Sequence, residues 1–264
     1  MSNRRIHPSC IIDPGASIAD GVEIGPWTTV GPDVVIGEDC KIASHVVLKG
    51  PTQVGKNNQI FQFSSVGEDT PAVAYSGEST RLIIGDNNII REGVTIHRGM
   101  QQHNGETVVG NNNLFMAYVH IGHDCVVGSN VIMANNSSVS GHCNVGDYAN
   151  IGGYAGVPQF RSIGAYTHIA GMSLVLKDVP AYVTAGGHPA CAVGMNTEGM
   201  KRRGMEQSTI DALGTAYRLV FRKGLLVNEA LEQLAPLVEQ YSEVALFADS
   251  VRNSQWGIVR ARSK

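Results

Sequence analysis

Aliphatic residues recur at every sixth position along most of this chain. The series runs from Ile6 to Val66, resumes over 84–96 and again over 109–175. Glycine often follows the aliphatic residue, and a small residue such as Cys40 often comes four positions after it. A period of six fits neither an α-helix, which repeats at 3.6, nor a plain strand, which alternates at two. Because the period continues over most of the first 175 positions, it indicates a repeat architecture.

The hexapeptide period predicts a triangular parallel β-helix, a prism built from short strands. Each hexapeptide would form one strand and one tight corner, with its aliphatic side chain pointing inward and glycine easing the corner. Three hexapeptides then make one full turn of the prism. The interior of such a prism is narrow, and only 6% of the residues are aromatic. We therefore expect a mainly β fold over residues 1–190.

The six-residue register breaks at two places, 68–82 and about 98–108. Both segments are expected to project from the prism as loops. Long loops inside a regular repeat are more often functional than accidental.

A different pattern follows once the repeat ends, after Val183. Amphipathic periodicity predicts helices over 208–222, 228–241 and 243–254, with Asn228 as a plausible N-cap of the second. Residues 191–264 should therefore form an α-helical C-terminal domain that caps the coil stack. An open β-helix would also expose strand edges to aggregation, so side-by-side packing of three chains is expected.

Charge and cysteine content exclude several classes of protein. The net charge of −3 argues against a nucleic-acid binder that neutralises phosphates, and no apolar run is long enough to span a membrane. The N-terminal stretch from Met1 to Pro8 lacks the apolar core of a secretory signal. The five cysteines show no CxxC spacing, which fits a reducing cytoplasm better than a disulfide framework or zinc knuckle.

The charge is distributed unevenly along the chain. Residues 1–200 hold 10 Lys and Arg against 16 Asp and Glu, a net of −6, whereas residues 201–264 hold 10 against 7, a net of +3. The cap is therefore basic and the prism acidic.

A turn of three hexapeptides places positions that are three hexapeptides apart on successive coils. This spacing gathers five polar residues and one glycine of neighbouring coils on one patch of the outer wall: His120, His123, Asp124, Gly141, His142 and Gln159. The patch combines a base that titrates near neutral pH, an acid that could orient it and a backbone N–H without a side chain in the way.

Three interpretations of this patch are open from the residues alone. It could be a solvated, histidine-rich surface. It could be a zinc site formed by His120, His123 and His142, as in gamma-type carbonic anhydrases, which use the same prism. It could also perform general-base acyl transfer, with Asp124 orienting His123 and the Gly141 N–H stabilising an oxyanion.

Several longer motifs carry a resemblance to a known family. They include His120–Cys125, Phe61–Glu68, Ile90–Gly99, Lys177–Val183 and Asn196–Gly204. The chain resembles, nearly end to end, the UDP-N-acetylglucosamine 3-O-acyltransferases of lipid A synthesis, which are hexapeptide-repeat proteins. The resemblance implies a left-handed parallel β-helix with an α-helical cap, a cytoplasmic homotrimer, and active sites between neighbouring prisms.

The resemblance also implies a reaction and the residues that perform it. The donor would be a 3-hydroxyacyl thioester on acyl carrier protein, the acceptor a UDP-N-acetylglucosamine-type sugar, and no metal or other cofactor would be bound. His123 would act as the base with Asp124, and Gly141 as the oxyanion donor. The substrate-binding residues would be His120 and His142 at the sugar and diphosphate, Gln159 near them, Gly171 for acyl length, and Asn196, Glu198, Arg202 and Arg203 at the nucleotide. A basic surface of the cap would suit the acidic carrier protein: Lys201, Arg202, Arg203, Arg218, Arg222 and Lys223.

The chain departs from the family pattern at three places, of which the first normally holds the sugar. Ala72-Val73-Ala74 stands where the family has Asp-Leu-Lys, Pro158 stands where it has a histidine, and Trp256 stands where it has an arginine. Losing charge-assisted contacts of about 1.5–3 kcal/mol each would weaken sugar binding. The alternatives to the standard reaction are therefore a relative with altered acceptor or donor specificity, or a non-catalytic nucleotide-sugar-binding paralogue.

Overall fold

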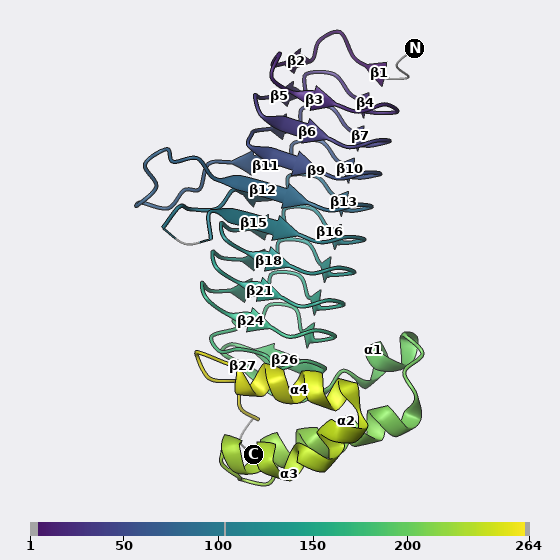
Figure 1. The fold of residues 1–264 in the computed structure, drawn as a ribbon, viewed down its shortest axis with the longest axis vertical. Helices are drawn as coiled ribbons and strands as arrows, with labels where there is room; N and C mark the ends of the chain where they lie inside the picture. The colour runs from purple at the N-terminus through teal and green to yellow at the C-terminus, as the bar shows by residue number, and fades with distance from the viewer. Residues whose placement is uncertain (1–4, 103, 262–264) are drawn as a thin grey trace.

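The structure is a computed structural model that describes residues 5–102 and 104–261. Residues 1–4, 103 and 262–264, which belong to the expected prism, second loop and cap, lie outside the described residues. Figure 1 shows a tall stack of short strands that begins at the N-terminus and ends on a group of helices. Among the described residues, no helix has the length and apolar character needed to cross a bilayer.

Three sheets form the walls of the prism. The first wall contains β1 (Arg5–Ile6), β4 (Glu23–Ile24), β7 (Lys41–Ile42), β10 (Gln59–Ile60), β13 (Ile89–Ile90), β16 (Leu114–Phe115), β19 (Ile132–Met133), β22 (Asn150–Ile151) and β25 (His168–Ile169), followed by β26 (Val183–Gly187) and β27 (Ala190–Met195). The second wall contains β2 (Ile11–Ile12), β5 (Thr29–Val30), β8 (Val47–Leu48), β11 (Ser65–Glu68), β14 (Thr95–His97), β17 (His120–Ile121), β20 (Ser138–Val139) and β23 (Gly156–Val157). The third wall contains β3 (Ser17–Ile18), β6 (Val34–Ile36), β9 (Thr52–Val54), β12 (Arg81–Ile84), β15 (Glu106–Val109), β18 (Val126–Val127), β21 (Asn144–Val145) and β24 (Ser162–Ile163).

The chain visits the walls in the order first, second, third, and then starts the next coil. Corner 1 joins the first wall to the second, corner 2 the second to the third, and corner 3 the third to the next first strand. Neighbouring strands within a wall are parallel, and Ile121 pairs with Val139, three hexapeptides later. The predicted parallel β-helix and its turn of three hexapeptides are therefore confirmed.

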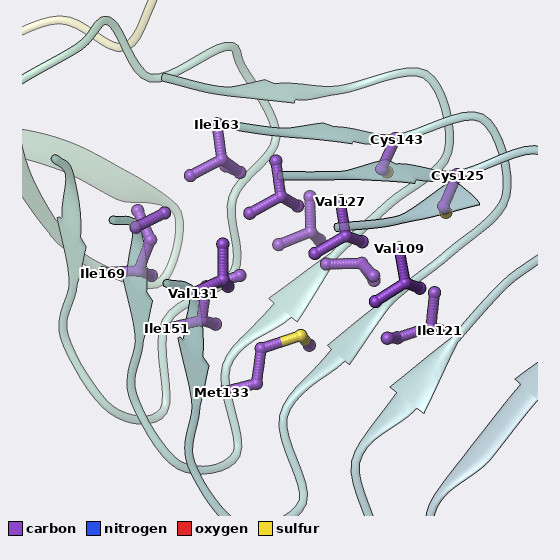
Figure 2. Close-up of a cluster of buried hydrophobic side chains, with 14 of the residues drawn as sticks. Val109, Ile121, Cys125, Val127, Val131, Met133, Cys143, Ile151, Ile163 and Ile169 are labelled. Atoms are coloured by element: carbon purple, nitrogen blue, oxygen red, sulfur yellow. The ribbon is translucent and has the colours of Figure 1, made fainter. Parts of the chain in front are cut away.

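The aliphatic residues of the hexapeptides fill the interior. Figure 2 shows several of them, among them Ile121, Val127 and Met133, converging between the walls, and all three are 1% exposed or less. The thiols of Cys125 and Cys143 donate hydrogen bonds to the carbonyls of Ser140 and Pro158 on the next coil, at 3.0 and 3.1 Å. These thiols are therefore free and serve to satisfy corner carbonyls.

Both projecting loops leave the prism at corner 2. The first connects β11 to β12 and the second connects β14 to β15, so each runs from the second wall to the third. Figure 1 shows the two loops beside each other on the same side of the stack. They therefore extend from the corner at which residues 122–125 also lie.

The C-terminal part differs from the expectation in detail. β26 and β27 form an antiparallel hairpin on the first wall that the hexapeptide period does not indicate. The hairpin spans the boundary expected at residues 190 and 191, so the division into two domains stays a prediction. The helices are α1 (Thr197–Arg202), α2 (Gln207–Phe221), α3 (Val227–Gln240) and α4 (Ser242–Arg252).

The three predicted helices, which are α2, α3 and α4, begin and end close to their expected bounds, whereas α1 was not predicted. The N-cap assigned to Asn228 is wrong, because Leu226 occupies that position. The Glu229 carboxylate accepts a hydrogen bond from the Leu226 N–H at 2.9 Å, which satisfies an N-terminal donor of the helix without an Asn cap.

Candidate active site

A histidine and a carboxylate form a buried pair at corner 2. His123 Nδ1 lies 2.8 Å from Asp124 Oδ2, and the two residues are only 6% and 2% exposed. The Met100 N–H, from the second loop, donates to the same oxygen at 3.0 Å. The pair lies outside the hydrophobic interior, as the sequence predicts, and it is nevertheless buried.

The ionisation of Asp124 fixes the role of each nitrogen of His123. Burial acts to raise the pKa of the Asp124 carboxyl, but the hydrogen bonds from His123 and Met100 outweigh burial, and the pKa lies below its usual value. A carboxylate only accepts hydrogen bonds, so Nδ1 of His123 carries the proton. Nε2 is then left with a lone pair that can accept a proton from a substrate.

Two glycines leave room beside Nε2. A Cβ on Gly141 would lie 2.5 Å from Nε2 of His123, and a Cβ on Gly122 would lie 2.6 Å from the Gly141 nitrogen. Among the described residues, none accepts a hydrogen bond from the Gly141 N–H. A donor without a protein partner next to a base is what an oxyanion would use.

His142 lies against the pair from the neighbouring coil. Its Nδ1 is 3.9 Å from Asp124 Oδ2, and its ring meets that of His123 edge-on with centroids 4.7 Å apart. On its other side it stacks on Phe160, with centroids 4.5 Å apart and planes 2° from parallel. These two ring contacts fix the orientation of the His142 imidazole. Gln159, the neighbour of Phe160, is exposed at the same corner.

His120 is on strand β17, beside two partners that sequence reasoning did not include. Its Nδ1 lies 2.8 Å from the Thr95 hydroxyl, and its ring is edge-on to that of His97 at 5.2 Å. Burial, followed by the charge of His123, lowers the pKa of His120. Burial, followed by the charge of His120, lowers the pKa of His97 to about 4. Both imidazoles are therefore neutral near pH 7 and can act as hydrogen-bonding groups.

The residues expected at the nucleotide lie at a different corner. Asn196 caps α1 by accepting from the Gly199 N–H at 3.1 Å, and its amide donates to the Tyr166 carbonyl at 2.8 Å. Tyr166 belongs to corner 3, between β24 and β25. The Arg203 guanidinium lies 4.1 Å from the ring centroid of Tyr148, also at corner 3.

A pocket of about 590 Å³ opens at this place. It is lined by residues of the first wall, corner 3 and α1, including Asn196, Glu198, Arg202, Arg203 and His168. His123 does not line it. The structure thus brings the four expected nucleotide residues together, but at a corner separate from the His123–Asp124 pair.

Gly171 lies at the third location, corner 1, where it is exposed. A Cβ added there would lie 3.2 Å from the Gly153 carbonyl oxygen. Within one chain, the expected site residues are thus distributed over all three corners.

The possibility of a metal site can be compared with the geometry. Ligand atoms of His123, Asp124 and His142 lie within 4.8 Å of one another. His120, which the sequence-based zinc interpretation included, is not in this group, and its Nδ1 is hydrogen-bonded with the Thr95 hydroxyl. The arrangement resembles a hydrogen-bonded base and its orienting acid more than the three-imidazole set that the zinc interpretation required.

Sequence reasoning did not single out His97, Arg98 or Met100 as site residues. Arg98 is 5% exposed and forms an ion pair with Asp69 of the first loop. The available signal was the register break itself, because both loops leave the corner at which the histidines lie.

Comparisons with known proteins agree with this architecture. Residues 178–259 match the family described as UDP N-acetylglucosamine O-acyltransferase, domain 2, and residues 5–36, 18–50 and 106–141 match bacterial transferase hexapeptide repeats. The chain is 53% identical over 255 residues to the acyl-(acyl-carrier-protein)–UDP-N-acetylglucosamine O-acyltransferase of Saccharophagus degradans, covering 97% of this chain and 99% of the relative.

Solved structures show the same similarity. The UDP-N-acetylglucosamine O-acyltransferase of Moraxella catarrhalis is 50% identical with a TM-score of 0.95, covering 97% of this chain and 99% of that one. A structure from Acinetobacter baumannii is 49% identical with the same TM-score and the same coverage. The fold is the left-handed parallel β-helix of these proteins, with helices at its C-terminal end.

Proposed function

The chain belongs to the UDP-N-acetylglucosamine O-acyltransferase family, and we propose how its own residues carry out the family's reaction. It is an acyltransferase that moves a 3-hydroxyacyl chain from acyl carrier protein to the 3-hydroxyl of UDP-N-acetylglucosamine, in lipid A synthesis. The observation that carries the mechanism is the buried His123–Asp124 pair beside the Gly141 N–H, which has no acceptor among the residues that the structure describes.

His123 acts as the general base. Nε2 takes the proton of the sugar 3-hydroxyl while the hydroxyl oxygen bonds to the thioester carbonyl carbon. The carbonyl oxygen becomes an oxyanion that accepts a hydrogen bond from the Gly141 N–H. When the intermediate collapses, the carbon–sulfur bond breaks, and the carrier thiolate takes the proton from His123. Asp124 stays ionised and stabilises the imidazolium in between.

His120 and His142 bind the sugar and diphosphate beside the base, together with Gln159. The pocket at corner 3 binds the nucleotide. Asn196 and Glu198 offer polar contacts to the nucleobase, and Arg202 and Arg203 offer positive charge to the phosphates. Gly171 leaves the acyl groove long, which suits a longer chain.

The separation of the base from the nucleotide pocket supports a homotrimer. The base lies at corner 2 and the nucleotide pocket at corner 3, so one chain does not line both parts of one site. Three prisms packed side by side would bring corner 2 of one chain to another corner of its neighbour. This geometry supports a homotrimer with sites between subunits, which we propose to act in the cytoplasm.

The donor is acyl carrier protein, and we propose that no metal or other cofactor is needed. The basic residues of the cap favour an acidic partner, with Arg218 and Arg222 on α2 or at its C-terminal end. The Ala72-Val73-Ala74 segment lies in the first loop, where Val73 is fully exposed. It offers the sugar neither the carboxylate nor the ammonium of the family pattern, so histidines and backbone groups bear more of acceptor binding.

The deciding experiment incubates the purified protein with UDP-N-acetylglucosamine and 3-hydroxyacyl carrier proteins of several chain lengths. Acylated sugar nucleotide is expected with at least one length, and His123→Ala should lower kcat by about 10²–10⁴-fold. Calorimetry should find sugar-nucleotide binding unchanged in that variant. Absence of turnover with every chain length would reject the proposed reaction. Full activity in His123→Ala would reject His123 as the general base.

A further inference from the structure

Arg98 joins the two projecting loops through a buried guanidinium. Nη1 donates to the Gly67 carbonyl at 2.5 Å, and Nη2 pairs with the Asp69 carboxylate and lies 3.2 Å from the Tyr75 hydroxyl. The Tyr75 hydroxyl in turn donates to Asp69 Oδ1 at 3.0 Å. Arg98 is only 5% exposed, and fixed partners replace the water of its two terminal nitrogens. The network therefore holds the start of the second loop against the first.

The same short segment reaches the catalytic pair at Met100. The Met100 N–H donates to Asp124 Oδ2 at 3.0 Å, and the Met100 carbonyl accepts from the Gly105 N–H at 3.0 Å. Between Arg98 and Met100, a Cβ on Gly99 would lie 2.2 Å from the Glu106 nitrogen, so the backbone is closely packed there. Met100 thus has little freedom to move unless Arg98 moves with it.

We propose that Arg98 is a positioning residue for the catalytic base. It fixes the segment 98–100 so that the Met100 N–H and His123 Nδ1 share one oxygen of Asp124, which sets the carboxylate in the plane that orients the imidazole. Because Asp69 and Tyr75 belong to the first loop, the conformation of that loop is coupled to the orientation of His123. This inference rests on the proposed function, since it assigns a role in the same reaction.

A purely structural role for Arg98 makes a different prediction. A residue that only stabilises the loops would lower the melting temperature and reduce the amount of active enzyme when substituted. It would leave kcat per active site unchanged, and it would have the same effect whether residue 124 is Asp or Asn. A positioning residue affects the chemical step through Asp124 and leaves sugar-nucleotide affinity nearly constant.

The first experiment compares matched variants. Arg98→Lys keeps the charge but cannot hold Gly67, Asp69 and Tyr75 together, and Tyr75→Phe removes one hydroxyl. The control is Arg81→Lys: Arg81 pairs with Glu106 at 2.6 Å and links the strands that follow the two loops, but its side chain is 63% exposed. We expect Arg98→Lys to lower kcat about tenfold, Tyr75→Phe less, and Arg81→Lys not measurably. KM for UDP-N-acetylglucosamine should stay within about twofold in all three.

The second experiment is a double-mutant cycle measured in single turnovers with active-site titration. In an Asp124→Asn background, adding Arg98→Lys should change the rate by less than about twofold, because the group through which Arg98 acts is already altered. If the two effects multiply, or if Arg98→Lys alone leaves kcat unchanged, the positioning role is overturned. An inactive wild type would instead reject the proposed function, so the two failures are distinguishable.

Discussion

A methyl group on Gly141 would lie 2.5 Å from Nε2 of His123. The imidazole cannot yield easily, because Asp124 holds its Nδ1 and the His142 ring lies edge-on against it. Gly141→Ala is therefore expected to displace the base and lower kcat by at least about tenfold, whereas global stability should change little. Steady-state kinetics and thermal unfolding measure the two effects separately.

Gly214→Ala is the matched control for that substitution. Gly214 lies inside α2, and a Cβ there would meet nothing within 4 Å. Alanine favours a helix over glycine by about 0.5–1 kcal/mol, so this variant should be fully active and slightly more stable. Equal activity of Gly141→Ala and Gly214→Ala would show that the space beside Nε2 is not needed.

Two inactive variants should restore activity when they share a trimer. His123→Ala damages corner 2, and Arg202→Ala damages the pocket at corner 3. If each site takes corner 2 from one chain and the nucleotide pocket from its neighbour, random 1:1 co-assembly should recover about a quarter of wild-type activity. Co-expressed, doubly tagged protein provides the measurement. Activity that never exceeds the sum of the parents would assign all site residues to one chain.

Stability should fall in acid partly through His97. Burial, with the charge of neighbouring His120, lowers its pKa from 6.5 to about 4, although nearby Glu68 opposes the shift and Arg98 adds to it. Below pH 6.5 the unfolded chain binds a proton that the folded protein excludes until about pH 4. The contribution of His97 to stability is therefore complete above pH 6.5 and is lost as the pH falls from about 6.5 to about 4.

His97→Asn removes that titration. We expect the variant to lose about 1–2 kcal/mol less stability than the wild type between pH 8 and pH 5. Denaturant unfolding at the two pH values measures the difference. Parallel losses in the two proteins would mean that His97 titrates alike in the folded and unfolded states.

The repeat pattern predicted the prism well because the same physical constraint acts at every coil. Each inward position, such as Ile121 or Val139, must fill a narrow interior, so the period appears in the sequence without long-range information. The spacing of three hexapeptides likewise predicted that His123, Gly141 and His142 would lie side by side. The amphipathic periods of α2, α3 and α4 were equally local signals.

The rest of the site depends on contacts that no period encodes. Met100 reaches Asp124 over 24 residues, because a loop intervenes and the spacing of three hexapeptides no longer applies. Residues 183–203 have neither the hexapeptide period nor a full amphipathic helix, so the β26–β27 hairpin and α1 were missed. Their positions follow from pairing with the last coil: Asn196 is held by the carbonyl of Tyr166, 30 residues earlier.

Chelation separates acyl transfer from metal chemistry at the same residues. The ligand atoms of His123, Asp124 and His142 lie close enough to hold an ion. The base mechanism needs His123 unmetallated, so dialysis against a chelator should leave the transfer rate unchanged, within about twofold. The metal content of the purified protein should be well below one zinc per chain. A chelator-sensitive rate that zinc restores would favour the metal-dependent alternative.

Corner 2 has a consequence for how this protein can diversify. Val66 and Ile84 face the interior on consecutive walls across the first loop, and Ile96 and Val109 do so across the second, shorter loop. In the other steps up to Val175, one hexapeptide separates consecutive interior positions, yet the strands after each loop still pair in register with the coil before. Length can therefore be added or removed at this one corner without rotating any later residue onto another wall. Insertions and deletions in these loops can therefore change the surroundings of His123, while the strands of the three walls keep their register.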